Sequence, residues 1–576
     1  MPPLQPIYDI AEICAKQGVT QAVLCPGSRC APLTIAFTRH EDITARTFSD
    51  ERSAAFVALG IAQQTNKPSV LVCTSGSAAF NFAPAVAESF FQQVPLLIFT
   101  ADRPKEWIDQ WDGQTIRQSE IFGAHVKKSF DLPADYEHAD AAWYSNRVVN
   151  EAINLSQEFP KGPVHINVPL REPLYPAKGE KILFSKSVRV IQQSNPLPSL
   201  SIEEKESLAT SLKGFTKILI VAGQQEYNNE LIKVVEKFSK AHHSVLVGDA
   251  ISNFHSSSST IRLADSFLAH GSNSVKESLK PELLITFGKS VISKNLKLFL
   301  RKYKPTEHWH IQPTGIAPDT FQSLTRIVTT TPRTFFESLT SAEKSTSFAS
   351  QKKENFKKLW EAEEHRVELS HQAYFKNSAF NELDILKEVI SSLPMRCNLH
   401  LSNSMAVRYA NMIGLTSSQK GIHVYANRGT SGIDGCTSTA VGNSISNEVP
   451  TILITGDMAF FYDRNAFWHN YKMPNLHIVL VNNHGGIIFG MIDGPGNLPE
   501  SNEYFVTNQK LTAKNLADEF NIEYISLDSQ KKIKNSLKDF FEFTGKTKIL
   551  EIQSEQKTAK EAFDKFNSQI KKAYDN

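Results

Sequence analysis

Short apolar runs alternate with longer amphipathic stretches along most of the chain. In the first third, each run except the last leads into a helical pattern, such as Arg52–Gln64 or Ser77–Gln92. Short apolar runs separated by amphipathic helices are typical of buried parallel strands in α/β units. The pattern therefore predicts a first α/β unit that ends near Pro176. Its predicted strands are Ala22–Cys25, Val70–Cys73, Leu96–Thr100 and Val164–Val168.

The same alternation resumes after a polar stretch with Pro and Ser (Lys178–Ser201), which is typical of a linker. A second unit is expected to end near Ser341, and the charged segment Gln351–His371 predicts a solvated helix. A third unit begins near Asn381. The predicted strands of these two units are Ile218–Ala222, Ser244–Val247, Leu283–Phe287, Asn398–Leu401, His423–Tyr425, Thr451–Thr455, Leu476–Val481 and Lys548–Ile552.

This organisation predicts an α/β fold with three domains of similar size, at 1–178, 195–345 and 372–576. Each domain is expected to have a central, mainly parallel sheet flanked by helices. A chain of 576 residues is too long for one hydrophobic core, which agrees with several domains. No internal sequence repeat is clear enough to indicate a duplication.

Composition narrows the class of protein. The hydrophobic fraction of 41% and charged fraction of 21% are ordinary for a globular protein, and the net charge is only +2. Without a long basic run, nucleic-acid binding is not indicated. Apolar runs far shorter than the roughly 20 residues of a membrane span argue against membrane insertion. The N-terminus resembles no secretory signal, and the six cysteines contain no CxxC, so we expect buried free thiols in a cytoplasmic protein.

Polar turns follow two successive predicted strands of the third unit. Gly456-Asp457-Met458 follows one strand, and Asn482-Asn483-His484-Gly485-Gly486 follows the next. The carboxyl ends of parallel strands share one edge of a sheet, which is where open α/β sheets bind ligands. We therefore expect these two turns to lie together.

The residue types in these turns match the ligands of Mg²⁺, with Mn²⁺ as an alternative metal. Asp457 offers a carboxylate, Asn483 an amide oxygen and Gly485 a backbone carbonyl. Mg²⁺ prefers such oxygen ligands together with phosphate oxygens and water. The alternative interpretation is two ordinary Gly/Asn turns at strand ends. His484 is expected to be a loop residue, because imidazole is a poor ligand for this hard cation.

Other cofactor motifs are absent from the sequence. No GxGxxG follows a predicted strand, and neither GxxxxGK[ST] nor HExxH occurs. The pair His242-His243 lies at a connection from a helix to a strand, without a carboxylate motif beside it. We interpret that pair as structural.

The spacing of the Gly-Asp and Asn-Asn pairs resembles the thiamine-diphosphate motif. Such a cofactor needs a carboxyl group against its aminopyrimidine ring, in a dry pocket that raises the proton affinity of that carboxyl. Glu51, at the start of a predicted helix in the first unit, suits this role. The alternative is that Asp50 or Glu51 only interacts with the helix N-terminus. The metal motif in a separate domain favours the catalytic interpretation.

Further segments are shared with one family. They are Cys25–Leu33, Asp50–Ala54, Thr100–Pro104, Gln114–Ile116, Gly162–Pro173 and Asn427–Gly435. In these segments the chain resembles the 2-succinyl-5-enolpyruvyl-6-hydroxy-3-cyclohexene-1-carboxylate (SEPHCHC) synthases of menaquinone (vitamin K2) biosynthesis. The resemblance covers nearly the whole chain, strongly in the first and third units and thinly in the middle one.

The resemblance implies an activity and an assembly. 2-Oxoglutarate would add to thiamine diphosphate and lose CO₂, and the resulting succinyl-semialdehyde carbanion equivalent would add to isochorismate in a 1,4-addition. The cofactor would lie between the first domain of one subunit and the third domain of another. A homodimer is then the minimal active unit, and a homotetramer is the alternative.

The resemblance also assigns residues. The two substrates carry four carboxylates, and the planar fork of Arg binds carboxylate in a bidentate way, although a single Arg is more often a surface or ion-pair residue. The implied substrate contacts are Ser28, Arg29, Arg103, Gln114, Lys294, Arg408 and Arg428. The implied cofactor contacts are Ser404 and Met405 at a helix start that can hold diphosphate, Gly456, Ile433 as the wedge that bends the cofactor, and Ile488, Phe489 and Ile492 as an apolar wall. Core packing is the alternative for the wall residues.

Three positions depart from the family pattern. Gly113 stands where an Asn often precedes Gln114, Asn295 where an Arg often follows Lys294, and His484 where an Asn is usual. These departures affect the expected substrate geometry more than the expected reaction class.

Two other functions stay open. One is a different thiamine-diphosphate-dependent 2-oxoacid decarboxylase or carboligase, such as a relative of acetohydroxyacid synthase or oxalyl-CoA decarboxylase. The other is a non-catalytic protein that binds thiamine diphosphate as a sensor. The four arginines argue against the first alternative, and Glu51 argues against the second, because binding alone does not require that carboxyl.

Overall fold

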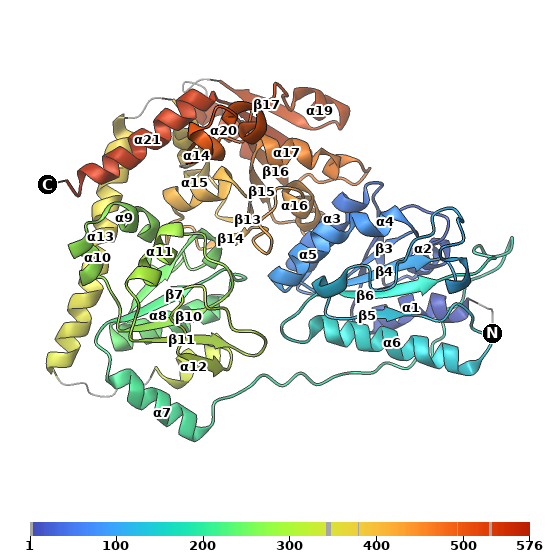
Figure 1. The fold of residues 1–576 in the computed structure, drawn as a ribbon. Coiled ribbons are helices and arrows are strands. Elements are labelled where there is room, and N and C mark those ends of the chain that lie inside the picture. The colour runs from blue at the N-terminus through green and yellow to red at the C-terminus, as the bar shows by residue number, and fades with distance from the viewer. Residues whose placement is uncertain (1–3, 341–346, 378–379, 492–493, 529–532, 576) are drawn as a thin grey trace.

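Three parallel sheets, each of six strands, organise the chain (Figure 1). The computed structural model describes residues 4–340, 347–377, 380–491, 494–528 and 533–575. The α/β fold with helices flanking parallel sheets is therefore confirmed. The predicted end of the second unit near Ser341 lies outside the described residues. We propose that the domains keep the predicted bounds 1–178, 195–345 and 372–576, because each interval contains one complete sheet.

The first domain has the strand order β2-β1-β3-β4-β6-β5. Its strands are β1 (Gln21–Leu24), β2 (Thr44–Thr47), β3 (Ser69–Cys73), β4 (Leu96–Asp102), β5 (Ser129–Asp131) and β6 (Val164–Pro169). Its helices are α1 (Gln5–Lys16), α2 (Ala31–Arg39), α3 (Glu51–Thr65), α4 (Ser77–Asn81), α5 (Ala83–Gln92) and α6 (Ala139–Gln157). The pattern at Ser77–Gln92 thus forms two helices, which meet where Pro84 opens α5. Proline fits the first turn of a helix but interrupts a continuous one.

The middle domain has the strand order β12-β11-β10-β7-β8-β9. Its strands are β7 (Ile218–Ala222), β8 (Val245–Gly248), β9 (Thr260–Ile261), β10 (Leu283–Phe287), β11 (Glu307–Gln312) and β12 (Arg326–Thr329). Its helices are α7 (Ile202–Lys213), α8 (Asn229–His242), α9 (Ala264–His270), α10 (Asn273–Ser278), α11 (Lys294–Lys302) and α12 (Pro332–Ser338). The long helix α13 (Ser347–Asn377) then leads to the third domain.

The third domain repeats the topology of the first, with the order β14-β13-β15-β16-β18-β17. Its strands are β13 (Arg396–Leu401), β14 (Gly421–Tyr425), β15 (Thr451–Gly456), β16 (Leu476–Asn482), β17 (Glu523–Leu527) and β18 (Lys548–Gln553). Its helices are α14 (Glu382–Ser391), α15 (Met405–Ile413), α16 (Cys436–Ser444), α17 (Asp457–Tyr462), α18 (Ile488–Met491), α19 (Lys514–Glu519), α20 (Ile533–Phe541) and α21 (Gln556–Lys572).

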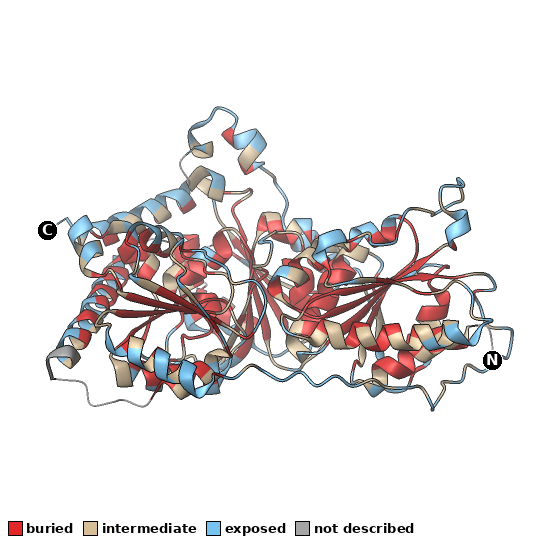
Figure 2. Cartoon of the chain, turned by 60° about the horizontal axis from the view of Figure 1, so that its bottom comes forward, coloured by how far each residue is buried: buried red, intermediate tan, exposed pale blue. Residues whose placement is uncertain are grey.

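The third sheet shares a hydrophobic core with each of the other two. On one face, Leu453 and Ile478 belong to the same cluster as Val23 and Leu71 of the first sheet. On the other face, Ile454 joins a cluster that includes residues of the middle sheet and of α13. Figure 2 shows the buried strands of the sheets and the exposed outer faces of the helices. The shared cores fix the three domains against one another.

The predicted linker runs between the first two domains without helix or strand (Figure 1). Part of it packs on the first domain, because Leu183 and Arg189 accept hydrogen bonds at their carbonyls from Gln5 and Asn150. The six cysteines are all free and buried, as predicted. In the described part of the chain, no helix is long and apolar enough to cross a membrane.

Buried histidines make the fold sensitive to acid. Burial lowers the pKa of His400 to about 3 and the pKa values of His165, His308 and His477 to about 4. The ordinary value in an unfolded chain is about 6.5. A lowered folded-state pKa means that protons bind preferentially to the unfolded chain. The stability linked to these rings is therefore complete above about pH 6.5 and is lost as the pH falls towards 4.

We expect His400→Phe to weaken this acid sensitivity. The phenyl ring can keep the stack on Tyr425, whose ring centroid lies 4.9 Å from that of His400, but it cannot titrate. Each proton taken up on unfolding changes the free energy of unfolding by about 1.4 kcal/mol per pH unit. Thermal unfolding midpoints between pH 7 and pH 4.5 should therefore fall less in the variant than in the parent chain. Parallel curves for the two proteins would contradict the assignment.

Candidate functional site

The strand order of the third sheet predicts where a ligand binds. The order reverses between β13 and β15, so the connections that follow these two strands diverge and leave a crevice at their carboxyl ends. Ser404 follows β13, Asp457 follows β15, and Asn483 follows the neighbouring strand β16. The two turns predicted from the sequence therefore lie on one edge of one sheet.

Asp457 and the turn after β16 are in contact. Asp457 is buried at the start of α17 and accepts a hydrogen bond from Gln509 Nε2 at 2.6 Å. Burial raises its pKa, and the opposing influences include Gln509 and the backbone of Gly485. Gly485 is tightly packed, because a Cβ there would lie 2.9 Å from Val506 O. His484 has φ +63°, a left-handed conformation in which both Asn and His are enriched.

Asn483 gives the clearest evidence that this turn fits a cation. Its side chain is buried, and its Oδ1 has no hydrogen-bond partner among the described residues. A buried oxygen without a partner is costly unless a ligand satisfies it. Asn483, Asp457 and Gly485 together form an oxygen donor set that fits Mg²⁺. In the described residues, no group of three His, Cys, Asp or Glu side chains could hold a metal, and this donor set contains only one of those residue types.

The start of α15 has the geometry expected for an anion site. Ser404 precedes the helix with φ +69° and Met405 begins it. A serine at positive φ is strained, and such strain is concentrated at functional sites. Gly456 faces open space, since a Cβ built on it would meet no atom within 4 Å. Open space beside a helix start is a common feature of anion sites, because backbone N–H groups there have no partner within the helix.

The loop Asn427–Gly435 is braced from both sides. Asn403 Nδ2 donates to Asn427 O and Gly432 O at 2.6 Å each, and Asn403 Oδ1 accepts from Arg428 Nη1 at 2.9 Å. From the first domain, the buried carboxylate of Glu88 accepts the N–H groups of Gly429 and Thr430, both at 2.7 Å. The loop that carries Arg428 and Ile433 is therefore held in one conformation.

Three predicted apolar contacts lie on this side of the third domain. Ile433 is half-buried in the braced loop, while Ile488 is half-buried and Phe489 partly exposed on α18. Ile488 packs against the core, which agrees with the alternative interpretation for that residue. Ile492 lies outside the described residues.

Basic residues of the third and middle domains gather beside this loop. Burial lowers the pKa of Arg428, while the nearby carboxylates of Asp249 and Glu88 oppose that change. Desolvation lowers the pKa of Arg408, and the charge of Arg428 lowers it further. Burial lowers the pKa of Lys297 on α11, and the charge of nearby Arg428 lowers it further. Lys294, which the resemblance assigned, begins α11 and is exposed.

A second pair of arginines lies in the first domain. Arg29 is buried after β1, and its Nη1 donates to Leu170 O at 2.9 Å. Burial lowers its pKa, and the charge of Arg103 lowers it further. Arg103 forms an ion pair with Asp112 at 3.1 Å, and its Nη2 donates to Gly113 O at 3.1 Å. These contacts of the two arginines all lie within the first domain.

Two polar residues border this first-domain pair. Ser28 is exposed and lies 2.7 Å from the hydroxyl of Tyr175. Gln114 is exposed with φ +56° and lies against Gly76, which follows β3. Since the order of the first sheet also reverses between β1 and β3, both residues border its ligand-binding edge.

Glu51 and Asp50 have separate positions at the start of α3. Asp50 is the N-cap, whose Oδ1 accepts from Arg52 N at 2.9 Å and Ser53 N at 3.2 Å. The helix-capping alternative thus applies to Asp50. Burial raises the pKa of the Cys25 and Cys73 thiols, and the charge of Glu51 is among the smaller influences that raise it further, so Glu51 lies near the ends of β1 and β3.

Within one chain, Glu51 is not at the metal-ligand turn. Its neighbour Arg52 donates from Nη2 to Tyr462 O at 2.9 Å, and Tyr462 is the last residue of α17. Asp457 begins that helix, so about 8 Å of helix separates the two ends. The predicted site residues therefore form two separate groups within one chain, one on the first domain and one on the third.

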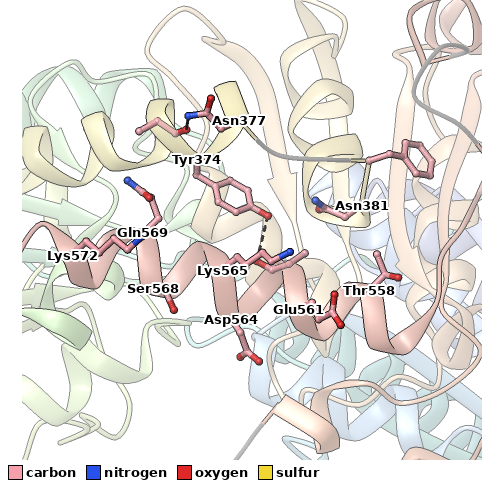
Figure 3. A pocket seen from close by; sticks show the side chains of 13 residues that line it. Tyr374, Asn377, Asn381, Thr558, Glu561, Asp564, Lys565, Ser568, Gln569 and Lys572 are labelled. Carbon is pink, nitrogen blue, oxygen red and sulfur yellow. Dashed lines mark hydrogen bonds between the residues drawn. The ribbon is translucent and has the colours of Figure 1, made fainter.

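A surface pocket elsewhere in the molecule does not include these residues. A cavity of about 480 Å³ lies between α13 and α21, lined by Tyr374, Glu561 and Lys565 among others (Figure 3). Tyr374 donates there to Ala562 O at 3.2 Å. None of the predicted site residues lines this pocket.

Comparisons with known proteins agree with this geometry. The chain matches the models for the thiamine pyrophosphate enzyme N-terminal TPP binding domain at residues 8–121 and for the middle domain of thiamine pyrophosphate enzymes at 191–401. It is 46% identical to the SEPHCHC synthase of Cytophaga hutchinsonii over 99% of this chain and 100% of that protein. The chain belongs to the SEPHCHC synthase family.

Other relatives support the family assignment. The SEPHCHC synthase of Flavobacterium johnsoniae is 39% identical over 94% of this chain and 95% of its own, and that of Bacteroides fragilis is 36% identical over 93% of each. Among solved structures, the thiamine diphosphate-dependent 4-hydroxybenzoylformate decarboxylase of Rhodococcus jostii RHA1 matches with a TM-score of 0.67. That match has 15% identity, covers 96% of this chain and 99% of the other, and shows the shared fold alone.

In the middle sheet of this SEPHCHC synthase family member, the strand order also reverses at one point. The crevice at that point is closed. Read from β9, its order is that of dinucleotide-binding folds, with the reversal between β7 and β10. The connections after these strands are paired, since Gln224 N donates to Ser290 O and Lys289 N to Gln224 O, both at 2.9 Å. A Cβ on Gly223 would lie 2.2 Å from Lys289 O. The backbone therefore fills the crevice where folds with this strand order bind a dinucleotide.

Sequence reasoning missed several residues that shape the site. Glu88, Asp249, Lys297 and Glu382 belong to none of the recognised motifs. Glu88 accepts a hydrogen bond from Gly429, which lies 341 positions later in the sequence, so the contact is visible only in the folded structure. The one signal in the sequence is that Glu88 is the only charged residue in the helical pattern Ser77–Gln92, and the structure shows it buried at 1% exposure.

We expect Glu88→Gln to loosen the braced loop. The amide keeps one acceptor oxygen but presents an NH₂ group to the donors of Gly429 or Thr430. Losing a buried hydrogen bond to a charged group costs about 1.5–3 kcal/mol. Amide hydrogen exchange of the peptide 427–435 should therefore accelerate about tenfold or more. Glu41→Gln, at an exposed position of the same domain, is the control, and unchanged protection in Glu88→Gln would contradict the role of that carboxylate.

Proposed function

We propose that this chain catalyses the SEPHCHC synthase reaction: decarboxylation of 2-oxoglutarate and transfer of its succinyl-semialdehyde unit to isochorismate, in menaquinone biosynthesis. The observation that carries this proposal is the near full-length identity of 46% with a SEPHCHC synthase. Two separate pairs of arginines support it, because the two substrates together present four carboxylates. A small neutral acceptor would not require so many fixed cations.

The third domain has the residues to hold the cofactor. Thiamine diphosphate, when bound, supplies the carbanion-stabilising thiazolium ring. Asp457, Asn483 and Gly485 would bind Mg²⁺, with Mn²⁺ as the alternative, and the metal would hold the diphosphate. Ser404, Met405 and Gly456 would surround the diphosphate oxygens. Ile433 would support the bent cofactor, with Ile488 and Phe489 excluding water beside it.

Glu51 would act on the pyrimidine end. Its carboxyl would hydrogen-bond a ring nitrogen of the aminopyrimidine and hold the proton that favours the imino tautomer. The surroundings of Glu51 near Cys25 and Cys73 support that role, because both cysteines are buried and a dry environment strengthens hydrogen bonding.

The arginines would bind the substrate carboxylates. Arg29 and Arg103, with Ser28 and Gln114, form the anion-binding group of the first domain. Arg408 and Arg428 form that of the third domain, with Lys294 from the middle domain. Arg is suited to both because its fork binds a carboxylate in a bidentate way and keeps its charge when desolvated.

A homodimer would bring the site residues on the first domain of one subunit to those on the third domain of the other. A homotetramer is the larger alternative. The side-chain contacts of Arg29 and Arg103 lie in the first domain, whereas Arg408 donates to Ser404 O and Arg428 to Asn403 Oδ1 within the third domain. Exposed aromatic side chains on both domains provide apolar surface for a partner subunit. They are Phe80, Phe91, Trp107, Trp111, Tyr462 and Trp468. We place the enzyme in the cytoplasm, which the buried free thiols support.

Mixing purified protein with thiamine diphosphate, Mg²⁺, 2-oxoglutarate and isochorismate should consume isochorismate and release one CO₂ for each molecule consumed. Ultraviolet absorbance of isochorismate and a coupled CO₂ assay measure the two changes. Omitting either substrate or the cofactor should stop both. CO₂ release that is indifferent to isochorismate would indicate another decarboxylase, and cofactor binding without any turnover would indicate a sensor.

A complementation experiment tests whether two subunits share each site. Glu51→Gln and Asp457→Ala should each abolish most activity, because one removes the activating carboxyl and the other a metal ligand. In a mixed dimer with sites between subunits, one of the two sites contains neither substitution. Co-expressed at equal levels, the two variants should therefore recover about a quarter of the parent activity.

Sites built within one chain would give no recovery in the same experiment. Mixing each variant with itself under the same conditions is the matched control. Sedimentation of the parent protein distinguishes the dimer from the tetramer.

A further inference from the structure

Glu382 is a buried carboxylate that no part of the proposed mechanism uses. It begins α14, is 0% exposed, and lies beside the metal-ligand turn of the third domain. Two donors reach it: Tyr409 Oη donates to Oε1 at 2.5 Å, and Asn483 Nδ2 donates to Oε2 at 3.2 Å. Burial raises its pKa, while the hydrogen bonds from Tyr409 and Asn483 and its place at a helix N-terminus favour the negative charge.

The contact with Asn483 decides which atom that side chain presents. An amide has an oxygen that accepts and an NH₂ group that donates, and the two ends exchange places when the group rotates by half a turn. A carboxylate accepts only, so Nδ2 must face Glu382. The opposite orientation would place Oδ1 against a carboxylate oxygen. Oδ1 is thereby directed away from Glu382, and it is the buried oxygen without a partner.

We propose that Glu382 is a positioning residue that locks the amide of Asn483 with its oxygen towards the divalent cation. The inference rests on the proposed metal site at Asp457 and Asn483. An amide that is free to rotate would present its NH₂ group to the cation for part of the time, and NH₂ is not a metal ligand. Partners that orient a ligand in this way commonly affect metal affinity by about 10–100-fold.

A swap of the two side chains gives the sharpest test. In Glu382→Gln, the new amide can accept from or donate to Asn483, so the orientation is no longer fixed. In Asn483→Asp, two carboxylates face each other at the hydrogen-bond position. The double variant Glu382→Gln/Asn483→Asp exchanges the acid and the amide. The amide introduced at position 382 would donate to one oxygen of the new aspartate and leave its other oxygen for the cation.

The measurement is the affinity for Mn²⁺ in the presence of thiamine diphosphate, followed through the electron paramagnetic resonance signal of free Mn²⁺. We expect each single variant to bind Mn²⁺ about tenfold or more weakly than the parent, and the double variant to recover most of that loss. Tyr409→Phe is the matched control, because it removes the donor to the other oxygen of Glu382 and leaves the contact with Asn483. It should change the affinity by less than about threefold, well below the range expected for a lost orienting partner.

Two results would overturn the proposal. One is parent-like Mn²⁺ affinity in folded Glu382→Gln, with folding checked by circular dichroism. The other is a double variant that binds no better than the single variants, which would indicate a packing role. Failure of the metal site itself is a separate outcome, because the parent chain would then bind no Mn²⁺ with the cofactor, or Asp457→Ala would bind it unchanged.

Discussion

The contact between α3 and α16 leaves no room for a methyl group, and the placement of the site depends on it. A Cβ on Gly60 would lie 2.0 Å from Thr439 O, and one on Gly442 would lie 2.0 Å from Val57 O. Backbones in such close contact hold the first domain on the third with little freedom to slide. Both helices begin next to predicted site residues, since Glu51 starts α3 and the Arg428 loop leads into α16. The two helices thus form a rigid support for Glu51 and for the Arg428 loop. Functional groups of this kind must be placed accurately.

The rigid packing of the domains also holds charged side chains in place around Arg428. A desolvated guanidinium is costly unless opposite charges and hydrogen bonds surround it. Here Asp249 of the middle domain and Glu88 of the first domain approach Arg428 of the third, so each domain contributes one charge. Because the domains share cores, these charges are held in place before a ligand arrives. Cations that are fixed in advance need little reorganisation when a carboxylate binds, which is how such sites gain affinity and rate.

The sequence predicts the centre of each sheet better than its edges. Apolar runs such as Ile218–Ala222 and Leu283–Phe287 coincide with β7 and β10. The pattern did not single out β11, because its buried histidines look polar in the sequence. Those rings are satisfied by Thr286 Oγ1, which lies 2.8 Å from both His308 and His310. A two-residue edge strand such as β9 has too short a pattern to detect.

Topology and long-range contacts lie beyond that pattern. The first and third sheets share one strand order although no sequence repeat is visible. Strand order depends on where each connection passes, and unrelated apolar side chains satisfy the same topology equally well. The candidate ligands could be predicted because each follows a strand within a short motif. Glu382 could not, because its partner Asn483 is 101 positions away.

The departures from the family pattern show how local constraints preserve a site while its residues change. Asn295 lacks the charge of the arginine that is common there, but its backbone N–H donates to Asp265 at 3.0 Å and so helps to fix the start of α11. Lys297, two residues or about half a turn later on that helix, lies near enough to Arg428 and Asp249 for their charges to affect its pKa. The middle domain therefore retains a cation beside the braced loop, although not at the expected position.

His484 follows the same logic, because the turn requires a residue that accepts positive φ, and His meets that requirement without acting as a ligand. In both places the backbone geometry is kept while the side chain varies. Counting identical motif residues therefore underestimates how much of the geometry of the site is preserved.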